Sequence, residues 1–160
     1  MLKLLQNNQF DTIYHEHFSY FSLITLEKSF SRHGLVIFDV DELTTHGGSL
    51  RIYLKHIDNN QHPISPKVKK LQNIEIESGL TQLKTYENFA VHVNQVKKQL
   101  QQFCMNAKNK NKKIIGYGAP AKGNTLLNYC QINDELIEYT VDVNPYKQGL
   151  FLPGTKIPIK

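Results

Sequence analysis

A glycine-rich turn that follows a short apolar run is the sequence feature that most limits how this chain can fold. Residues 114–125 read Ile-Ile-Gly-Tyr-Gly-Ala-Pro-Ala-Lys-Gly-Asn-Thr, and a second apolar run at 136–141 ends at Asp142. In dinucleotide-binding proteins a buried strand leads through such a turn into a helix, and an acidic residue follows about 20 residues later. The spacing therefore predicts a Rossmann-like strand, turn, helix and strand in this part of the chain.

The same turn is expected to attract anions. Gly116 and Gly118 permit a tight turn, and the small residue Ala121 is expected to let the helix approach the strand closely. Backbone N–H groups at the start of a helix have no intrahelical partner and attract phosphate. Lys122 adds a positive charge at the same place, so the turn is a candidate phosphate site.

The rest of the pattern predicts a helix, two strands and a long helical segment. Apolar residues at helical spacing predict a helix at 23–33, followed by a strand at 35–40 and an alternating strand at 49–56. These two strands are expected to pair antiparallel. The polar, proline-containing stretch 57–66 is typical of a linker, and the helical period after it predicts one long helix or a pair of helices at 67–111.

Composition and charge argue against several classes of protein. No apolar segment approaches the roughly 18 residues of a membrane span, and the chain does not begin with a secretory signal pattern. The net charge of +5 comes largely from lysines on and after the long helical segment, without the interleaved aromatic residues of a nucleic-acid surface. Cys104 and Cys130 lack metal-type spacing. We therefore expect a cytoplasmic, reduced protein that binds no nucleic acid, membrane or metal.

The densest cluster of reactive side chains lies at residues 11–21, where His15 and His17 flank Glu16 and tyrosines stand on both sides. Two histidines at i and i+2 do not share a helix face, so a metal site is not indicated. A histidine of ordinary pKa, about 6.5, can accept a proton near neutral pH, and a neighbouring carboxylate can orient its ring. Acid–base catalysis and simple packing at the edge of a core are both open interpretations.

A second cluster, residues 46–51, reads His-Gly-Gly-Ser-Leu-Arg. Adjacent glycines allow either a tight hairpin turn or the close approach of a ligand to the backbone. A plain hairpin accounts for the glycines, and it leaves open why His46 and Arg51 frame them.

Four motifs in this order resemble those of the nucleotide-sugar C-methyltransferases of deoxysugar biosynthesis. They occupy residues 10–17, 46–51, 116–130 and the tail at 141–149 with 153–159, so the resemblance covers nearly the whole chain. Members of that family have a small zinc-binding domain, an S-adenosylmethionine-binding methyltransferase domain and a C-terminal Rossmann-like domain.

The resemblance implies an α/β fold in two parts. Residues 1–56 would be the end of a class I methyltransferase sheet, 57–66 a linker, and 67–160 a long helical segment with a truncated Rossmann-like domain. The cysteine cluster of the zinc domain and the main S-adenosylmethionine loop are expected to lie outside this chain. It would then be a fragment of an enzyme, with a missing N-terminal half or a second copy as partner, because exposed strand edges favour association.

The resemblance also implies a reaction and its residues. A base removes the proton next to the ketone of a nucleoside-diphosphate deoxyhexulose, and the enolate takes a methyl group from S-adenosylmethionine. The base would be His17, with Tyr14 and Glu16 helping the base or the enolate oxygen. The nucleotide-sugar would be bound by further residues of the motifs, namely His46, Arg51, Gly116, Gly118, Lys122, Asn124 and Asp142.

Two other functions remain open from the sequence. One is a nucleotide or nucleotide-sugar binding module without catalysis, and the other is a fragment of an NAD-dependent oxidoreductase. The oxidoreductase is favoured only by the glycine turn and Asp142, and the cluster around His17 argues against it. Binding of S-adenosylmethionine would distinguish a methyltransferase from a simple binding module.

Overall fold

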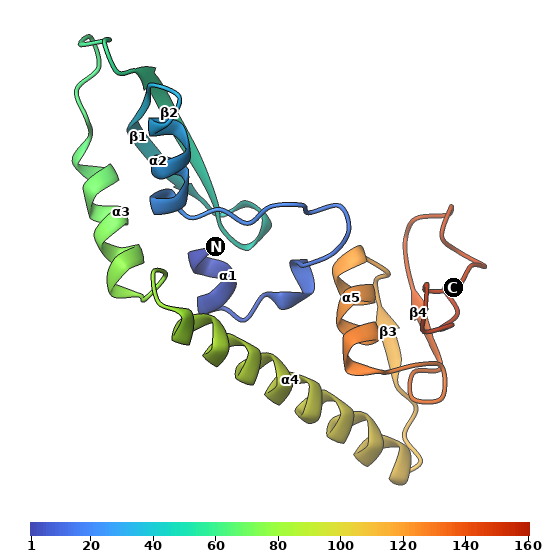
Figure 1. Ribbon diagram of the computed structural model, residues 1–160. Coiled ribbons are helices and arrows are strands. Elements are labelled where there is room, and N and C mark those ends of the chain that lie inside the picture. Colours follow the sequence, from blue (N-terminus) through green and yellow to red (C-terminus); the bar gives the residue numbers. More distant parts are fainter. The chain divides into compact units, whose positions relative to one another are not determined.

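The molecule contains two sheets, and each has two strands (Figure 1). The computed structural model describes all of residues 1–160, and the chain is mixed α/β as predicted. In chain order the elements are α1 (Leu2–Gln6), η1 (Phe10–Thr12), α2 (Leu23–Ser31), β1 (Leu35–Leu43), η2 (Thr45–Gly47), β2 (Ser49–His56), α3 (Pro66–Glu77), α4 (Leu83–Asn109), β3 (Ile115–Tyr117), α5 (Ala121–Cys130) and β4 (Tyr139–Val141).

The chain forms two compact units, and each unit combines two separate stretches of the sequence. Residues 1–9 and 19–89 make up the first unit, and residues 10–18 and 90–160 make up the second unit. Helix α4 begins in the first unit and continues in the second. The predicted domain boundary at 57–66 lies in a segment without helix or strand until α3 begins at Pro66, and its assignment as a linker between domains stays a prediction.

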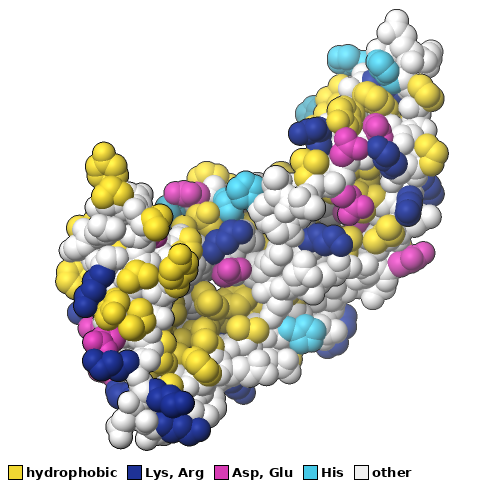
Figure 2. All heavy atoms as spheres, turned by 180° about the vertical axis from the view of Figure 1, so that it is seen from behind, with side chains coloured by type: hydrophobic (Ala, Val, Ile, Leu, Met, Phe, Trp, Pro, Cys, Tyr) yellow, Lys and Arg dark blue, Asp and Glu magenta, His cyan; other side chains and the backbone are white.

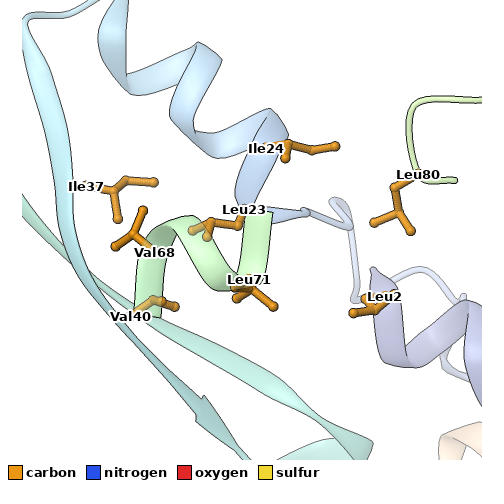
Figure 3. Close-up of a cluster of buried hydrophobic side chains, with 8 residues drawn as sticks. All are labelled: Leu2, Leu23, Ile24, Ile37, Val40, Val68, Leu71 and Leu80. Atoms are coloured by element: carbon orange, nitrogen blue, oxygen red, sulfur yellow. The ribbon is translucent and has the colours of Figure 1, made fainter. Parts of the chain in front are cut away.

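The first unit is built on the antiparallel pair β1–β2, as predicted. Its register runs from the pair Leu35 and His56 to the pair Leu43 and Ser49, with an irregularity after Ile37. Helices α2 and α3 contact β1. Their apolar side chains meet those of α1 and of the turn after α3 in one buried cluster (Figure 3), which contains Leu2, Leu23, Ile24, Ile37, Val40, Val68, Leu71 and Leu80.

The backbone N–H groups at the start of α2 are satisfied by side chains from two directions. The Ser22 side chain accepts from the backbone N–H of Thr25, and the Thr25 side chain accepts from the backbone of Ser22, which is a capping box. The Glu75 carboxylate of α3 accepts the N–H groups of Leu23 and Ile24, each at 2.9 Å. This buried polar contact ties α3 to the start of α2.

The predicted helical segment after the linker is a pair of helices. Helix α3 begins at Pro66, with the Ser65 side chain accepting from the backbone of Lys67, and α4 begins at Leu83. The separation lies around Gly79, so the predicted alternative of two helices is confirmed. None of the helices, α4 included, is long and apolar enough to cross a membrane.

The second unit contains the predicted strand, turn, helix and strand. Strands β3 and β4 pair parallel, with Gly116 opposite Thr140, and α5 connects them. Helices α4 and α5 and the end of the chain bury a second apolar cluster, which contains Cys104, Ala119, Cys130, Ile132, Ile137, Leu152, Ile157 and Ile159. A parallel bridge between Thr140 and Ile159 extends the sheet by the last residues. Two short sheets do not identify a class I methyltransferase or Rossmann fold, and those assignments stay predictions.

Two details of this unit differ from expectation. The apolar run at 136–141 forms a strand only from Tyr139, because the N–H groups of Leu136 and Ile137 turn back to the Asn133 carbonyl. Ala121 is exposed and does not mediate close packing of helix and strand. The close approach occurs at Gly116, where an added Cβ would lie 2.8 Å from the Thr140 hydroxyl.

Candidate functional site

The segment that carries His17 belongs to the same compact unit as the glycine turn, although more than half of the chain separates them in sequence. Helix η1 lies beside α5 (Figure 1), and the Phe10 ring contacts the Tyr129 ring with centroids 5.1 Å apart. After η1 the backbone turns, with the His17 N–H donating to the Tyr14 carbonyl at 2.9 Å. The turn places the Tyr14 and His17 rings against each other, with centroids 4.4 Å apart.

The Thr12 carbonyl determines which nitrogen of His17 carries the proton. His17 Nδ1 lies 2.8 Å from this carbonyl oxygen and 3.3 Å from the Thr12 hydroxyl. A carbonyl oxygen can only accept, so we assign the proton of the neutral ring to Nδ1. The lone pair then resides on Nε2, which is the form of imidazole that can take up a proton there.

Glu16 occupies a different place from that expected for a carboxylate that orients His17. Its carboxylate lies 4.0 Å from His15 Nε2, and both side chains are largely exposed. The backbone carbonyl of Thr12, and not this carboxylate, contacts Nδ1 of the His17 ring. The structure brings together Tyr14 and His17 among the predicted catalytic residues, and the catalytic roles of all three stay predictions.

The glycine turn between β3 and α5 is held by β4. Gly118 has a φ of +89°, a conformation that favours glycine, and its N–H donates to the Val141 carbonyl at 2.7 Å. The Thr140 hydroxyl donates to the Gly118 carbonyl at 2.7 Å. Gly116 and Gly118 are thus both required by local geometry, whether or not a ligand binds.

The N-terminus of α5 has no acidic residue and no capping side chain. Pro120 precedes the helix without a side-chain hydrogen bond, and Lys122 forms no ion pair. Asn124 is engaged along the helix, where its side-chain oxygen lies 3.3 Å from Asn128 Nδ2. The end of the helix therefore presents N–H groups and one cation, which together favour an anion.

Asp142 and Lys147 hold the loop after β4 against the glycine turn, and we call these two residues the clamp. The Asp142 carboxylate accepts from the N–H groups of Ala119 at 2.7 Å and Asn144 at 2.9 Å, and from Lys147 Nζ at 3.1 Å. Lys147 Nζ also donates to the Ala119 carbonyl at 2.9 Å. The N–H groups of Asn144 and Ala119, together with the Lys147 ammonium, keep the pKa of Asp142 below its ordinary value.

The residues of the 46–51 cluster lie on different faces of the first unit. Gly47, Gly48 and Leu50 line a hollow of about 470 Å³ that is also bounded by α1 and by Glu75 of α3. Arg51 is exposed and lies opposite Asp41 in the β1–β2 register. Side chains alternate between the faces of a strand, so Leu50 and Arg51 cannot point into one site. His46 is exposed, with a φ of +53°, and does not line the hollow.

Sequence reasoning missed three residues that shape these regions, namely Thr12, Glu75 and Lys147. Glu75 had a usable signal, because it follows Val68 and Leu71 at the helical spacing of a buried face. Thr12 acts through its backbone carbonyl, and Lys147 depends on the path of the loop after β4, so neither leaves a local signal.

Neither cysteine belongs to a metal cluster. No group of three or more histidine, cysteine, aspartate or glutamate side chains is arranged to hold a metal ion. Cys104 in α4 and Cys130 in α5 are free, buried thiols, and burial raises the pKa of each. Both therefore act as small apolar groups of the second core.

Comparison with known proteins identifies a family and a relative. The family model described as the C-methyltransferase C-terminal domain matches residues 44–160. The C-methyltransferase NovU of Streptomyces niveus is 39% identical over 159 residues, a stretch that covers 99% of this chain. The chain spans 38% of the length of that relative.

Proposed function

Because this chain belongs to the C-methyltransferase family, we propose that it supplies the base and part of the nucleotide-sugar site of a sugar-methylating enzyme. The substrate would be a nucleoside-diphosphate keto-deoxysugar, methylated at the carbon beside its ketone. Two motifs that this reaction needs, the His17 segment and the glycine turn, belong to one compact unit.

The observation that carries this proposal is the contact between His17 Nδ1 and the Thr12 carbonyl, at 2.8 Å. It keeps the neutral ring in the form whose Nε2 can accept the proton from the sugar carbon. The electron pair of the broken C–H bond then moves towards the ketone oxygen and gives an enolate. The contact with the Tyr14 ring limits rotation of the imidazole, and the Tyr14 hydroxyl would assist at the enolate oxygen.

The residues of the first unit do not fit a site for S-adenosylmethionine. When bound, this cofactor supplies the methyl group. Nucleotide-like cofactors bind at the carboxyl ends of neighbouring parallel strands, whereas the first unit has one antiparallel pair. We therefore propose that the cofactor is held by residues outside this chain, which spans 38% of the length of its relative. No methyl-transfer step is assigned to the residues present.

The parallel sheet of the second unit is the proposed place for the nucleotide-sugar. Its glycine turn, the start of α5 and Lys122 offer N–H groups and positive charge to a diphosphate. Asp142 would act indirectly, because its carboxylate is engaged by Ala119, Asn144 and Lys147. This engagement disfavours the oxidoreductase, in which the acid would hold the ribose of a dinucleotide.

A second candidate function is binding of a nucleotide-sugar without catalysis. It is favoured by the small antiparallel sheet of the first unit, which has no neighbouring parallel strands at which a nucleotide-like cofactor would bind. In this case the second unit would still bind the diphosphate, and His17 would have only a structural role.

Deuterium exchange at the carbon next to the ketone tests the proposed base without requiring the methyl donor. The chain is incubated in D₂O with a thymidine-diphosphate 4-keto-6-deoxyhexose, and loss of the proton signal is followed by NMR. We expect His17→Ala to slow exchange roughly 100- to 10,000-fold, since this is the usual contribution of a general base. His15→Ala, at the exposed neighbouring histidine, is the matched control and should leave the rate unchanged.

Calorimetry distinguishes the two candidate functions. Titration with the same nucleotide-sugar and then with S-adenosylmethionine measures whether each ligand binds. Binding of the sugar with no His17-dependent exchange would contradict the enzyme and favour the binding module. Binding of S-adenosylmethionine would contradict our placement of its site outside this chain.

A further inference from the structure

Three exposed apolar side chains surround the glycine turn of the second unit. Tyr117 is 93% exposed, Val143 is 92% exposed and Tyr146 is 88% exposed. The space-filling view shows many hydrophobic side chains at the surface of this unit, interspersed with lysines (Figure 2). Tyrosine rings this open to water are unusual in a folded unit, so their place in the fold is informative.

The fold brings two of these residues, Tyr117 and Val143, to one edge of the sheet. Tyr117 is the last residue of β3, and Val143 follows the end of β4, its parallel neighbour. In open α/β sheets the carboxyl ends of parallel strands are where ligands bind. Tyr117 and Val143 therefore lie at the edge at which a nucleotide is expected.

The clamp holds the two tyrosine-bearing loops together. Lys147 follows Tyr146 directly and donates to the Ala119 carbonyl in the glycine turn, while Asp142 accepts the Ala119 N–H. The Tyr146 N–H donates to the Asn144 side chain at 3.0 Å, which holds the backbone of Tyr146 itself. The backbones beside both rings are thus anchored, although the rings themselves are open to solvent.

The chemistry of this edge suits a nucleoside diphosphate. Neither Tyr117 nor Tyr146 forms an aromatic contact within the chain, so both ring faces can receive a planar group. Lys122, one helical position inside α5, adds a cation without an acidic partner. Stacking of bases on aromatic side chains needs no particular base, because every base has a π-face.

We propose that Tyr117 and Tyr146 form the nucleoside subsite, on which the base of the sugar nucleotide stacks while its diphosphate lies at the glycine turn. This assignment rests on the proposed function, in which the second unit binds the nucleotide-sugar. The clamp residues Asp142 and Lys147 are positioning residues, because they hold the loops and do not contact the base.

Calorimetric titration of the full chain with thymidine diphosphate, and separately with inorganic pyrophosphate, tests this subsite. Tyr117→Ala and Tyr146→Ala should each weaken thymidine diphosphate binding about tenfold and leave pyrophosphate binding unchanged. Tyr146→Phe should retain the affinity, because the ring face is kept. Phe103→Ala, at an exposed aromatic residue of α4, is the matched control and should change neither affinity.

Three results would overturn the subsite. Equal affinity of wild type and both alanine variants for thymidine diphosphate would remove the base from these rings while leaving the proposed function intact. Absence of thymidine diphosphate binding to the wild-type chain would contradict both the subsite and the proposed function. Unchanged affinity with a smaller sedimentation coefficient for Tyr146→Ala would assign this surface to contact with a second copy.

Discussion

The two units of this chain use a carboxylate for the same purpose in opposite surroundings. Glu75 in the first unit accepts two N–H groups at the start of α2 and is only 1% exposed. Asp142 in the second unit accepts the N–H of Ala119 before α5, but Lys147 and solvent share its surroundings. The first carboxylate is buried beside the apolar cluster and stabilises a core, whereas the second holds a turn that is more accessible to solvent.

The two sheets also differ in how much of their apolar surface is covered. In the first unit, Leu50, Ile52 and Leu54 of β2 pack against the buried cluster, so one sheet face is covered. In the second unit, Ile115 and Tyr117 of β3 are both exposed. Parallel strands are normally buried on both faces. The comparison indicates that the first unit is organised by its own core, while the second leaves apolar surface open around its candidate site.

The largest effect is expected from Glu75→Gln, which tests whether the first unit depends on its buried carboxylate. The amide can accept only one of the two N–H groups, and its own NH₂ would face the other. We expect a loss of about 3 kcal/mol in the free energy of unfolding. Urea unfolding measures the loss, and faster hydrogen exchange of the α2 amides should locate it in the first unit.

The matched control is Glu77→Gln, an exposed residue of the same helix, which should have almost no effect. If the two variants were equally stable, Glu75 would not be the enclosed cap described above, and the contrast with Asp142 would disappear.

The next effect is expected from Gly116→Ala, which tests how closely β3 and β4 pack. The new Cβ would lie 2.8 Å from the Thr140 hydroxyl and 3.0 Å from Thr140 Cβ. Overpacking of this kind costs about 2 kcal/mol. Loss of protection at Thr140 and Val141 in hydrogen-exchange NMR should accompany the lower stability.

The glycine in the neighbouring helix, Gly123, is expected to show the opposite effect on stability when it is replaced by alanine. At Gly123 an added Cβ would meet Pro120 only at 3.4 Å, and alanine favours helix, so Gly123→Ala should stabilise by about 0.5 kcal/mol. If Gly123→Ala destabilised the protein as much as Gly116→Ala, close packing between β3 and β4 would not explain the loss at Gly116.

The smallest effect is expected from Asp142→Asn, and it should depend on pH. The N–H groups of Asn144 and Ala119 and the Lys147 ammonium lower the pKa of Asp142 in the folded state. Its stabilising contribution is therefore complete above the unfolded pKa of about 4 and is lost as the pH falls through the lower folded value. The variant should be less stable than wild type at pH 7, and the difference should vanish in acid.

Chemical denaturation between pH 3 and pH 7 measures this convergence. Glu75→Gln serves as the comparison, because its defect should lie in the other unit. A stability difference for Asp142→Asn that stayed constant across this range would contradict the role of the ionised carboxylate in the clamp.

Local patterns predicted much of the architecture. The alternation of Ser49–His56 specified β2, and the apolar spacing after Ser22 specified α2, because each depends on one element burying one face. The glycine turn was located correctly for a similar reason, since β3, α5 and β4 follow one another along the chain. The beginning of β4 was misplaced, because the buried residue Ile137 precedes the strand, and β1 runs three residues beyond the expected end at Val40.

The candidate site was less accessible to prediction. The motif around His17 was recognisable, but the partner of its ring is the Thr12 carbonyl and not the carboxylate of Glu16. In the cluster at 46–51, His46 and Arg51 were expected to bind the nucleotide-sugar; both are exposed, and that role stays a prediction. Such contacts depend on backbone direction, which residue types alone do not specify.

By itself, the sequence determined the family, most of the helices and strands, and the small set of residues capable of acid–base chemistry or phosphate binding. These properties follow from residue order and short-range periodicity. Only the tertiary structure decided that residues 10–18 join the C-terminal unit, that Glu75 caps α2, and that Asp142 and Lys147 hold the glycine turn. Some of these contacts join residues that are far apart in the chain, and others depend on the path of a loop. They are therefore determined by packing and hydrogen-bond geometry.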